Sequence, residues 1–344
     1  MASAPGKVLV MELAGLGDNV HLLPALWELR AHWPGAEIHV MVNSHVEALF
    51  RLAPWVDRTW GYPRPRPSLA GSLAWTRQLR AERFDCVINT TGSDRSSLIA
   101  WGTGAPMRIG RRPADGGPPG WAWLFTHVVD EPYYRDPMYV QKWNLMGAAL
   151  LGPGRRFAGA PRFHVAIDAS LRRAAGIAAA DEGRYIHLSP CTTADERELP
   201  AAQLAALVDG LRRAFPQLRL ALSCAGDARE QQRMEALLAL LPQPPWKVFR
   251  GSLEVDVLAA VIEKAALAFS GDTGSLHLAL MTGTPAVAWF RTHPGEREWI
   301  PREPQYRVLV TEGGARDALH GISTAALLAA AHELLAAGAR DSMR

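Results

Sequence analysis

Cysteine is scarce in this sequence, with only three residues among 344, at Cys86, Cys191 and Cys224. They lie far apart and none belongs to a CxxC pair, so neither a disulfide framework nor a cysteine-based zinc site is indicated. We therefore expect no metal and no cofactor, and a reducing compartment suits the chain.

Long apolar runs and a strong net charge are also missing. No segment reaches the roughly 18 apolar residues of a spanning helix, and the short apolar run before Glu12 is typical of neither a signal peptide nor an anchor. The 37 Lys and Arg, almost all of them Arg, nearly balance 34 Asp and Glu, which does not favour nucleic-acid binding. We expect a cytoplasmic protein whose arginines suit an anionic substrate or membrane surface.

What the sequence does contain is a regular alternation of short apolar runs and longer amphipathic segments. In the first half this pattern predicts strands at 8–11, 38–42 and 86–89, and helices at 20–32, 46–52, 72–83 and 138–151. In the second half it predicts strands at 185–188, 218–223, 247–249, 267–269, 286–290 and 307–310, with helices starting near Pro200, Asp227, Leu253 and Leu276. The fold class is therefore α/β, with two doubly wound, Rossmann-like parallel sheets.

A stretch rich in Gly and Pro separates the two halves. Between Leu151 and Phe163 the sequence loses its periodicity, which is typical of a linker. We predict one domain at 1–155 and a second at 163–322, with a final helix in 323–344 for which packing back on the first domain is one placement. Ligands of such domains bind at the carboxyl ends of the strands, so a cleft between the two halves is expected.

Residues 270–279 carry the strongest local signal. A buried strand ends at Gly271, and Asp272, Thr273 and Gly274 lead directly into a helix that contains His277. The free N–H groups of a helix start and its dipole attract anions, so this turn predicts a diphosphate site. The alternative is a loop that only caps the helix.

The first strand also leads into a polar turn. After Gly15 and Gly17, Asp18 stands at the entry of the next helix, where a carboxylate can take a proton from an acceptor hydroxyl. An ordinary helix cap is the alternative for Asp18. As a dinucleotide fingerprint the loop fails, because Val20 occupies the position of the third glycine.

Three further loops of the second half follow predicted strands. Thr192, Thr193 and Arg197 are candidates for the same diphosphate, Glu230 for a ribose diol, and the backbone at Gly251 for a base edge. An ordinary loop and a solvated helix face are the alternatives.

Taken together, three segments resemble the heptosyltransferases of glycosyltransferase family 9, and they occur in order over nearly the whole chain. The segments are Gly-Leu-Gly-Asp18-Asn-Val-His-Leu-Leu-Pro-Ala-Leu, Thr192-Thr-Ala-Asp-Glu-Arg-Glu-Leu-Pro, and Asp272-Thr-Gly-Ser-Leu-His277-Leu-Ala. The resemblance implies a GT-B fold, an ADP-heptose donor held by the second domain and an acceptor held by the first. It also implies metal-independent transfer with inversion, at the inner core of lipopolysaccharide.

The resemblance assigns roles to individual residues. Asp18 matches the general base, and Glu230 matches an acid that contacts ribose. The phosphate-contacting positions are matched by Thr192, Thr193, Arg197, Asp272, Thr273, Gly274 and His277. Glu12 stands where the family often has Lys or another non-acidic residue, Arg197 stands where Lys is familiar, and Gly251 stands where a larger residue is familiar.

An anionic acceptor, such as Kdo on lipid A, needs cations on the first domain. The candidates are Arg64, Arg66, Arg108, Arg111 and Arg112, for which solvated surface positions are the alternative. Nearby aromatic residues can contact a lipid headgroup or a sugar, or belong to the core; they are Trp121, Trp123, Phe125, Tyr133 and Tyr134. A glycolipid acceptor implies peripheral contact with the inner face of the inner membrane.

Three other functions fit parts of the pattern. A family 9 transferase using another nucleotide sugar or an acceptor other than lipopolysaccharide fits the departures at Glu12 and Gly251. A nicotinamide-dependent dehydrogenase fits two α/β halves but not the broken glycine fingerprint. A non-catalytic two-domain ligand-binding protein would need neither Asp18 nor a leaving-group site.

Overall fold

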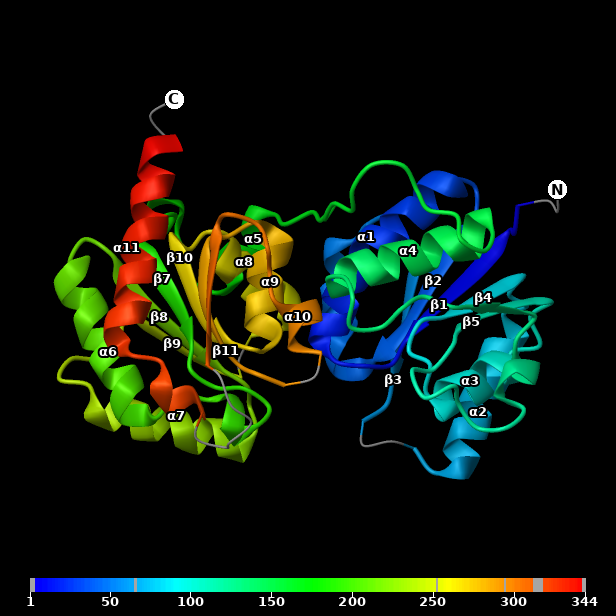
Figure 1. The fold of residues 1–344 in the computed structure, drawn as a ribbon, viewed down its shortest axis with the longest axis horizontal. Coiled ribbons are helices and arrows are strands. Elements are labelled where there is room, and N and C mark those ends of the chain that lie inside the picture. The colour runs from blue at the N-terminus through cyan, green and yellow to red at the C-terminus, as the bar shows by residue number, and fades with distance from the viewer. Residues whose placement is uncertain (1–3, 65–66, 252, 294, 312–317, 342–344) are drawn as a thin grey trace. The chain divides into compact units, whose positions relative to one another are not determined.

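The structure is a computed structural model that describes residues 4–64, 67–251, 253–293, 295–311 and 318–341. The chain forms two compact units, Met1–Ala166 and Ile167–Arg344, and each is built on a six-stranded sheet (Figure 1). The division falls a few residues beyond the Gly- and Pro-rich stretch.

The first sheet has the strand order β3-β2-β1-β4-β5-β6, with every neighbouring pair parallel. Its strands are β1 (Lys7–Glu12), β2 (Glu37–Asn43), β3 (Arg58–Tyr62), β4 (Cys86–Asn89), β5 (Met107–Arg111) and β6 (His127–Val129). The apolar residues of β1 are fully buried, because helices cover both faces of a parallel sheet. The strand order reverses between β1 and β4, and ligands of doubly wound sheets bind at such a switch point.

The helices of this unit are α1 (Leu16–His32), α2 (Leu69–Ala81), α3 (Asp94–Gly102) and α4 (Met138–Leu151), with 3-10 segments η1 (Ser44–Leu52) and η2 (Trp121–Leu124). The predicted helix at 46–52 is thus a 3-10 helix. The sequence pattern also missed β3, β5, β6 and α3. Gly and Arg interrupt β3 and β5, and β6 has only three residues, so these strands lack a continuous apolar run.

The second sheet repeats the same topology in the order β12-β11-β10-β7-β8-β9, again parallel throughout. Its strands are β7 (Tyr185–Ser189), β8 (Arg219–Cys224), β9 (Lys247–Arg250), β10 (Leu267–Gly271), β11 (Ala286–Arg291) and β12 (Tyr306–Thr311). All six were predicted from their apolar runs. The switch point of this sheet lies between β7 and β10, so two Rossmann-like units are confirmed.

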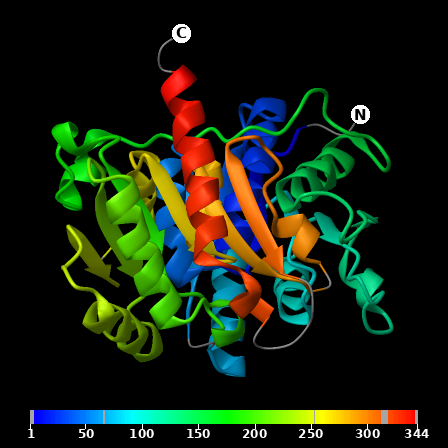
Figure 2. The same ribbon diagram turned by 60° about the vertical axis from the view of Figure 1, so that its left-hand side comes forward.

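The second unit is richer in helices, and its last helix belongs to it. The helices are α5 (Ala169–Ala174), α6 (Ala201–Ala214), α7 (Ala228–Leu240), α8 (Val255–Glu263), α9 (Gly274–Thr282), α10 (Glu296–Trp299) and α11 (Thr324–Asp341), with 3-10 segments η3 (Ala179–Asp181), η4 (Asp195–Arg197) and η5 (Ala318–Gly321). Figure 2 shows α11 along the second sheet beside α6. Among the described residues, no helix has the length and apolarity that crossing a bilayer requires.

The apolar stripe of α11 packs within the second unit. Leu327, Ala331 and Leu334 follow helical spacing and are buried in one cluster with Leu204 of α6 and Trp289 of β11. The core of the second unit therefore covers this stripe. The predicted packing of the helix on the first domain stays a prediction.

Candidate functional site

The loop between β1 and α1 lies at the switch point of the first sheet and is held by both neighbouring strands. Asn43, at the end of β2, donates its amide N–H groups to the carbonyls of Leu13 (2.7 Å) and Ala14 (2.8 Å). From the other side, the Leu13 N–H donates to Oγ1 of Thr91 just after β4 (2.8 Å). The turn that presents Asp18 is therefore fixed by side chains that the sequence analysis did not single out.

Asp18 is the third residue of α1, and its carboxylate accepts a hydrogen bond from the Gly15 N–H at 3.2 Å. The helix-cap alternative is thus realised in part, since this carboxylate satisfies a free donor at the helix start. The Asp18 side chain nevertheless stays 25 % exposed, which leaves one of its oxygens accessible to a ligand.

A buried ion pair lies directly beside Asp18. Glu12, at the end of β1, is fully buried and accepts hydrogen bonds from Thr90 Oγ1 (2.6 Å), Thr91 Oγ1 (3.0 Å) and the Lys142 ammonium. Lys142 belongs to α4, is itself buried, and places Nζ 3.9 Å from Asp18 Oδ1. The sequence analysis noted Glu12 only as a departure and missed Lys142, whose one signal is a cation within an otherwise apolar helix.

The charges in this cluster decide which carboxylate can act as a base. For Glu12, burial works to raise the pKa, but Lys142 and the two threonine hydroxyls outweigh it and hold the pKa below its usual value. For Asp18, burial raises the pKa to about 6, with Lys142 opposing and Glu12 adding to the rise. Asp18 is therefore mostly ionised at neutral pH yet more basic than an ordinary carboxylate.

Two of the acceptor-site arginines lie at the carboxyl end of β5. Arg111 is buried, donates to Gln141 Oε1 (2.7 Å) and to two backbone carbonyls, and stacks 3.6 Å from the Tyr133 ring centre. Arg112 is exposed and pairs with Asp130 at 2.5 Å. Arg111 thus adds positive charge close to α4, while Arg112 has its head group in solvent.

The other three arginines differ in their surroundings. Arg64, exposed after β3, adds to the effect of burial in lowering the pKa of His45. Arg66 lies outside the described residues. Arg108 is at the start of β5, the opposite end from Asp18, and donates to the carbonyls of Leu124 (2.9 Å) and Ala105 (2.6 Å). These donors hold a loop in this structure, and the assignment of Arg108 to the acceptor site stays a prediction.

At the second switch point, the turn between β10 and α9 is left open. Thr273 is the extended residue that precedes α9, and its own side chain makes no capping hydrogen bond to this helix. Gly271 permits the turn to pack tightly, because a Cβ there would lie 2.8 Å from Trp289 Nε1 and 3.0 Å from the Arg197 carbonyl. An uncapped helix start beside small residues is the geometry that binds an anion.

The loop after β7 brings a cation to this turn. Arg197 pairs with Asp272 at 3.1 Å and remains 38 % exposed, so its guanidinium can also reach a ligand. Thr193 is exposed. Thr192, by contrast, is buried and donates its hydroxyl to the Ala194 carbonyl (2.8 Å), so it shapes the loop in this structure. Its contact with a phosphate stays a prediction.

A buried carboxylate that the sequence analysis missed holds the same loop. Glu198 accepts the Thr192 N–H (2.6 Å) and pairs with Arg229 (3.1 Å) and Arg233 (2.8 Å) of α7. Two cations and an amide thus compensate its burial. The network connects α7 to the Arg197 loop.

Glu230 is in the first turn of α7, after β8, and Gly251 directly follows the adjacent strand β9. Glu230 accepts the Ala225 N–H (2.7 Å), and burial raises its pKa while that amide opposes the rise. Gly251 has a φ of +62°, and a Cβ on it would lie 2.3 Å from Gly226 Cα. The two glycine backbones therefore touch, which leaves a flat backbone surface beside a buried carboxylate.

His277 is in the first turn of α9 and is buried. Burial lowers its pKa to about 4, with Asp272 opposing, so the imidazole is neutral at pH 7. Its ring centre lies 5.3 Å from that of Trp299. It offers an anion a neutral ring rather than a charge. In the described part of the chain, no three His, Cys, Asp or Glu side chains group in a way that could hold a metal ion.

Comparison with known proteins agrees with this geometry. The family model described as glycosyltransferase family 9 (heptosyltransferase) matches residues 72–320. The lipopolysaccharide core heptosyltransferase OpsX of Haemophilus influenzae is 24 % identical over 305 residues, which are 84 % of this chain and 80 % of that protein.

Two solved structures share the fold. The family 9 glycosyl transferase from Veillonella parvula matches with a TM-score of 0.80 and 20 % identity, over 96 % of this chain and 97 % of that one. The E. coli heptosyltransferase WaaC with ADP-2-deoxy-2-fluoro heptose matches with a TM-score of 0.74 and 18 % identity, over 95 % and 99 %. These matches confirm the GT-B fold class. The chain belongs to glycosyltransferase family 9, the heptosyltransferase family, and is a glycosyltransferase.

Proposed function

We propose that this enzyme transfers heptose from ADP-heptose to Kdo of the lipopolysaccharide inner core, with inversion and without a metal. The observation that carries the proposal is Asp18, partly exposed at a switch point with a pKa of about 6, in a chain of this family. The names of two relatives support the substrates. OpsX is a lipopolysaccharide core heptosyltransferase, and the WaaC structure holds an ADP-heptose analogue.

In this reaction Asp18 takes the proton of an acceptor hydroxyl while the hydroxyl oxygen attacks the anomeric carbon of the donor. The bond from that carbon to the diphosphate oxygen breaks on the opposite face, so the anomeric configuration inverts. Its electron pair leaves with ADP, whose added charge needs donors in place beforehand. The open start of α9 and the Arg197 guanidinium are the groups that supply them.

The remaining site residues divide between the two substrates. Glu230 is suited to a ribose diol, Gly251 to a base edge, and Thr193 and His277 to the phosphates. Arg64, Arg111 and Arg112 provide positive charge for the carboxylates of Kdo or the phosphates of lipid A. With a glycolipid as acceptor, the enzyme works at the cytoplasmic face of the inner membrane.

The test is transfer from ADP-heptose to lipid A that carries Kdo but no heptose, followed by mass spectrometry with Asp18→Asn in parallel. We expect the mass of one heptose to be added by the wild type and not by the variant, while ADP binding persists in both. No transfer by a protein that binds ADP would reject the proposed acceptor.

Because Glu12 and Gly251 depart from the residues familiar in the family, the identity of the donor needs its own test. A panel of ADP-, UDP-, GDP- and dTDP-sugars tests it, and preference for a sugar nucleotide other than ADP-heptose would reject the donor. His277→Ala should weaken ADP binding in calorimetry, because it removes a ring from the first turn of α9. Unchanged ADP affinity would remove His277 from the donor site.

A further inference from the structure

Exposed apolar side chains gather on one part of the first unit. Of the eight large apolar side chains that are exposed among the described residues, five lie on α2, α3 and η2. We refer to these five as the apolar band: Leu69 (89 % exposed), Leu73 (51 %), Leu98 (57 %), Trp101 (55 %) and Trp123 (86 %). Large apolar groups collected on one surface are characteristic of a binding face.

The packing of α2 on α3 makes the band continuous. The helices touch where a Cβ on Gly102 would lie 2.3 Å from Thr76 Cγ2. At about 100° per residue, Leu69 and Leu73 lie within about 60° of Thr76 on α2, on the side away from buried Leu79. On α3, Leu98 lies about 40° from Gly102, also on its solvent side. The three leucine side chains of the two helices therefore border one seam.

The segment η2 extends this surface beyond α3. The Trp121 indole N–H donates to Ser97 Oγ (3.0 Å), which fixes η2 on the flank of α3. Ser97 lies only about 40° from Trp101 around the helix, so Trp101 stands between the α2 seam and η2. Trp123, on the same short segment, continues the band with an indole that is almost fully in solvent.

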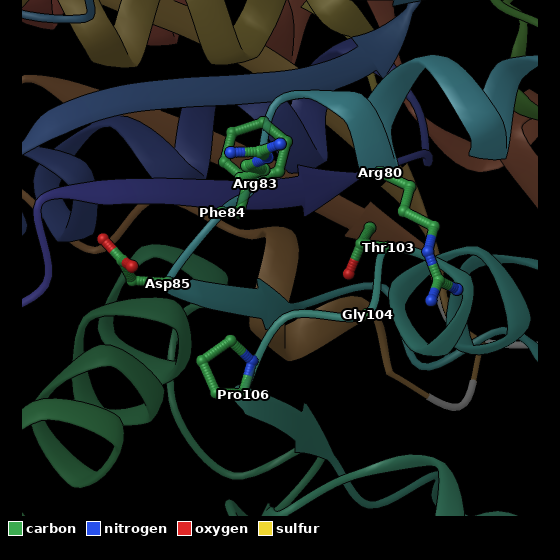
Figure 3. A pocket seen from close by; sticks show the side chains of 7 residues that line it. All are labelled: Arg80, Arg83, Phe84, Asp85, Thr103, Gly104 and Pro106. Atoms are coloured by element: carbon green, nitrogen blue, oxygen red, sulfur yellow. The ribbon is translucent and has the colours of Figure 1, made fainter.

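Positive charge accompanies the band. Arg80 is exposed and lies about 40° from Thr76, on the same face of α2 as the two leucines. With Arg83, Thr103 and Gly104 it lines a cavity of about 430 Å³ where α2 and α3 end (Figure 3). Among the described residues, no acidic side chain pairs with Arg80 or Arg83.

The one acidic group of this cavity is already engaged. Asp85 accepts the N–H groups of Gly6 (2.8 Å) and Lys7 (2.9 Å) through one oxygen, and in Figure 3 its carboxylate turns away from Arg80. The Thr103 hydroxyl is also engaged, since it donates to the Ala100 carbonyl (2.7 Å). The cavity therefore presents its two guanidinium groups to an anion.

We propose that the apolar band and this cavity dock the first unit on an anionic phospholipid bilayer, with Arg80 and Arg83 at a headgroup phosphate. Trp and Leu enter the interfacial region of a membrane, and nearby arginines add attraction to anionic lipid. The charge of the cavity favours this occupant over a neutral protein surface. This docking proposal rests on the proposed function in one respect, which is that a glycolipid acceptor brings the enzyme to a membrane.

The test is flotation of the full-length protein with vesicles of phosphatidylglycerol and phosphatidylethanolamine, compared with vesicles of phosphatidylcholine alone. We expect binding to the anionic vesicles only. Arg80→Glu with Arg83→Glu should weaken it by about 25-fold or more, and Trp101→Ser with Trp123→Ser by about tenfold or more. The matched controls on the second unit, Leu240→Ser and Arg302→Glu, should bind like wild type. All these side chains are exposed, so the variants should keep the wild-type melting temperature.

Several outcomes would contradict the proposal that this surface docks on a bilayer. These are wild-type binding no better to anionic than to neutral vesicles, equal losses in the controls, or band variants that bind like wild type. A dimer that the Trp101→Ser, Trp123→Ser variant turns into a monomer, without loss of vesicle binding, would assign the band to a second copy. Transfer to a detergent-dispersed acceptor separates the two proposals. This transfer should persist in the variants of the apolar band. If wild type binds vesicles but shows no transfer, the proposed function is rejected and the proposed bilayer-binding surface is not.

Discussion

The two units share one strand order but use the helix that follows a central strand in opposite ways. In the first unit, the start of α1 is occupied by the protein's own carboxylate, since Asp18 accepts the Gly15 N–H. In the second, the Thr273 side chain makes no capping hydrogen bond to α9, and Arg197 stands beside the helix start. One helix start therefore holds an anion that belongs to the fold, while the N-cap side chain of the other makes no such bond. Under the proposed function, the first helix start would hold the base and the second the leaving group.

The largest effect should follow from removing the Asp18 carboxylate. Asp18→Asn should lower kcat for transfer by about 1,000-fold, the range of a lost general base, while ADP binding is unchanged. In wild type, kcat/KM should rise with pH through about 6 and then level off, as the carboxylate ionises. Turnover by the variant above one tenth of wild type would reject Asp18 as the base.

The same variant should be more stable at alkaline pH. The folded protein raises the pKa of Asp18 from 3.8 to about 6, so it binds the proton more tightly than the unfolded chain does. The stability associated with this group is present below about pH 4 and is lost as the pH rises through 6. At pH 8, Asp18→Asn should gain about 2 kcal/mol in urea unfolding, and the gain should vanish below pH 4.

The buried pair behind Asp18 gives the next effect. Lys142→Met leaves Glu12 buried without its cation and should cost about 3 kcal/mol of unfolding free energy. It also removes the charge that lowers the pKa of Asp18, so the rise of kcat/KM with pH should move above 6. The double variant Glu12→Gln with Lys142→Met should recover most of the stability, because no uncompensated charge remains. A double variant as unstable as the single one would contradict this account.

In the second unit, the contact between two glycine backbones is the feature that we expect to be sensitive to substitution. Gly251→Ala adds a Cβ 2.3 Å from Gly226 Cα at a positive φ, so the two loops must separate. We expect a loss of about 2 kcal/mol in stability and weaker ADP binding, seen by urea unfolding and calorimetry. Gly283→Ala is the matched control, since φ is also positive there but no neighbouring atom lies near its Cβ. It should lose stability without losing ADP affinity.

The smallest effect should come from the open helix start. Arg197→Gln keeps the size of the side chain but removes its charge, and should weaken ADP binding about tenfold, the value of one charge-assisted hydrogen bond. Arg302→Gln, an exposed arginine elsewhere in the second unit, is the control. The comparison between the units would fail if Arg197→Gln bound ADP like wild type but changed the pH profile of transfer.

Sequence reasoning identified the parts of this molecule that local pattern determines. The apolar runs predicted every strand of the second sheet, and the turns at Asp18 and Asp272 lie at the two switch points. Charged partners from distant elements were missed, since Lys142 lies 130 residues from Glu12 in the chain. Glu198 was missed for the same reason, because its partners are on another helix.

Residue type alone also does not show which side-chain donors the fold already uses. Arg108 and Thr192 have the chemistry of binding residues, but their hydrogen bonds go to backbone carbonyls of the fold. A sequence shows which donors exist, whereas only the structure shows which are already in use. The fold was therefore easier to predict from the sequence than which polar groups stabilise it and which are available to a ligand.

The way Asn43 holds the turn before Asp18 has a consequence for the cost of binding. Its amide bonds the carbonyls of Leu13 and Ala14, and Thr91 holds the Leu13 N–H, so the turn is ordered by its own protein neighbours. The conformational entropy of the turn is therefore lost once, during folding, and not again each time an acceptor arrives. Under the proposed function, an acceptor would meet an already ordered base and keep more of its binding energy for reaching the transition state.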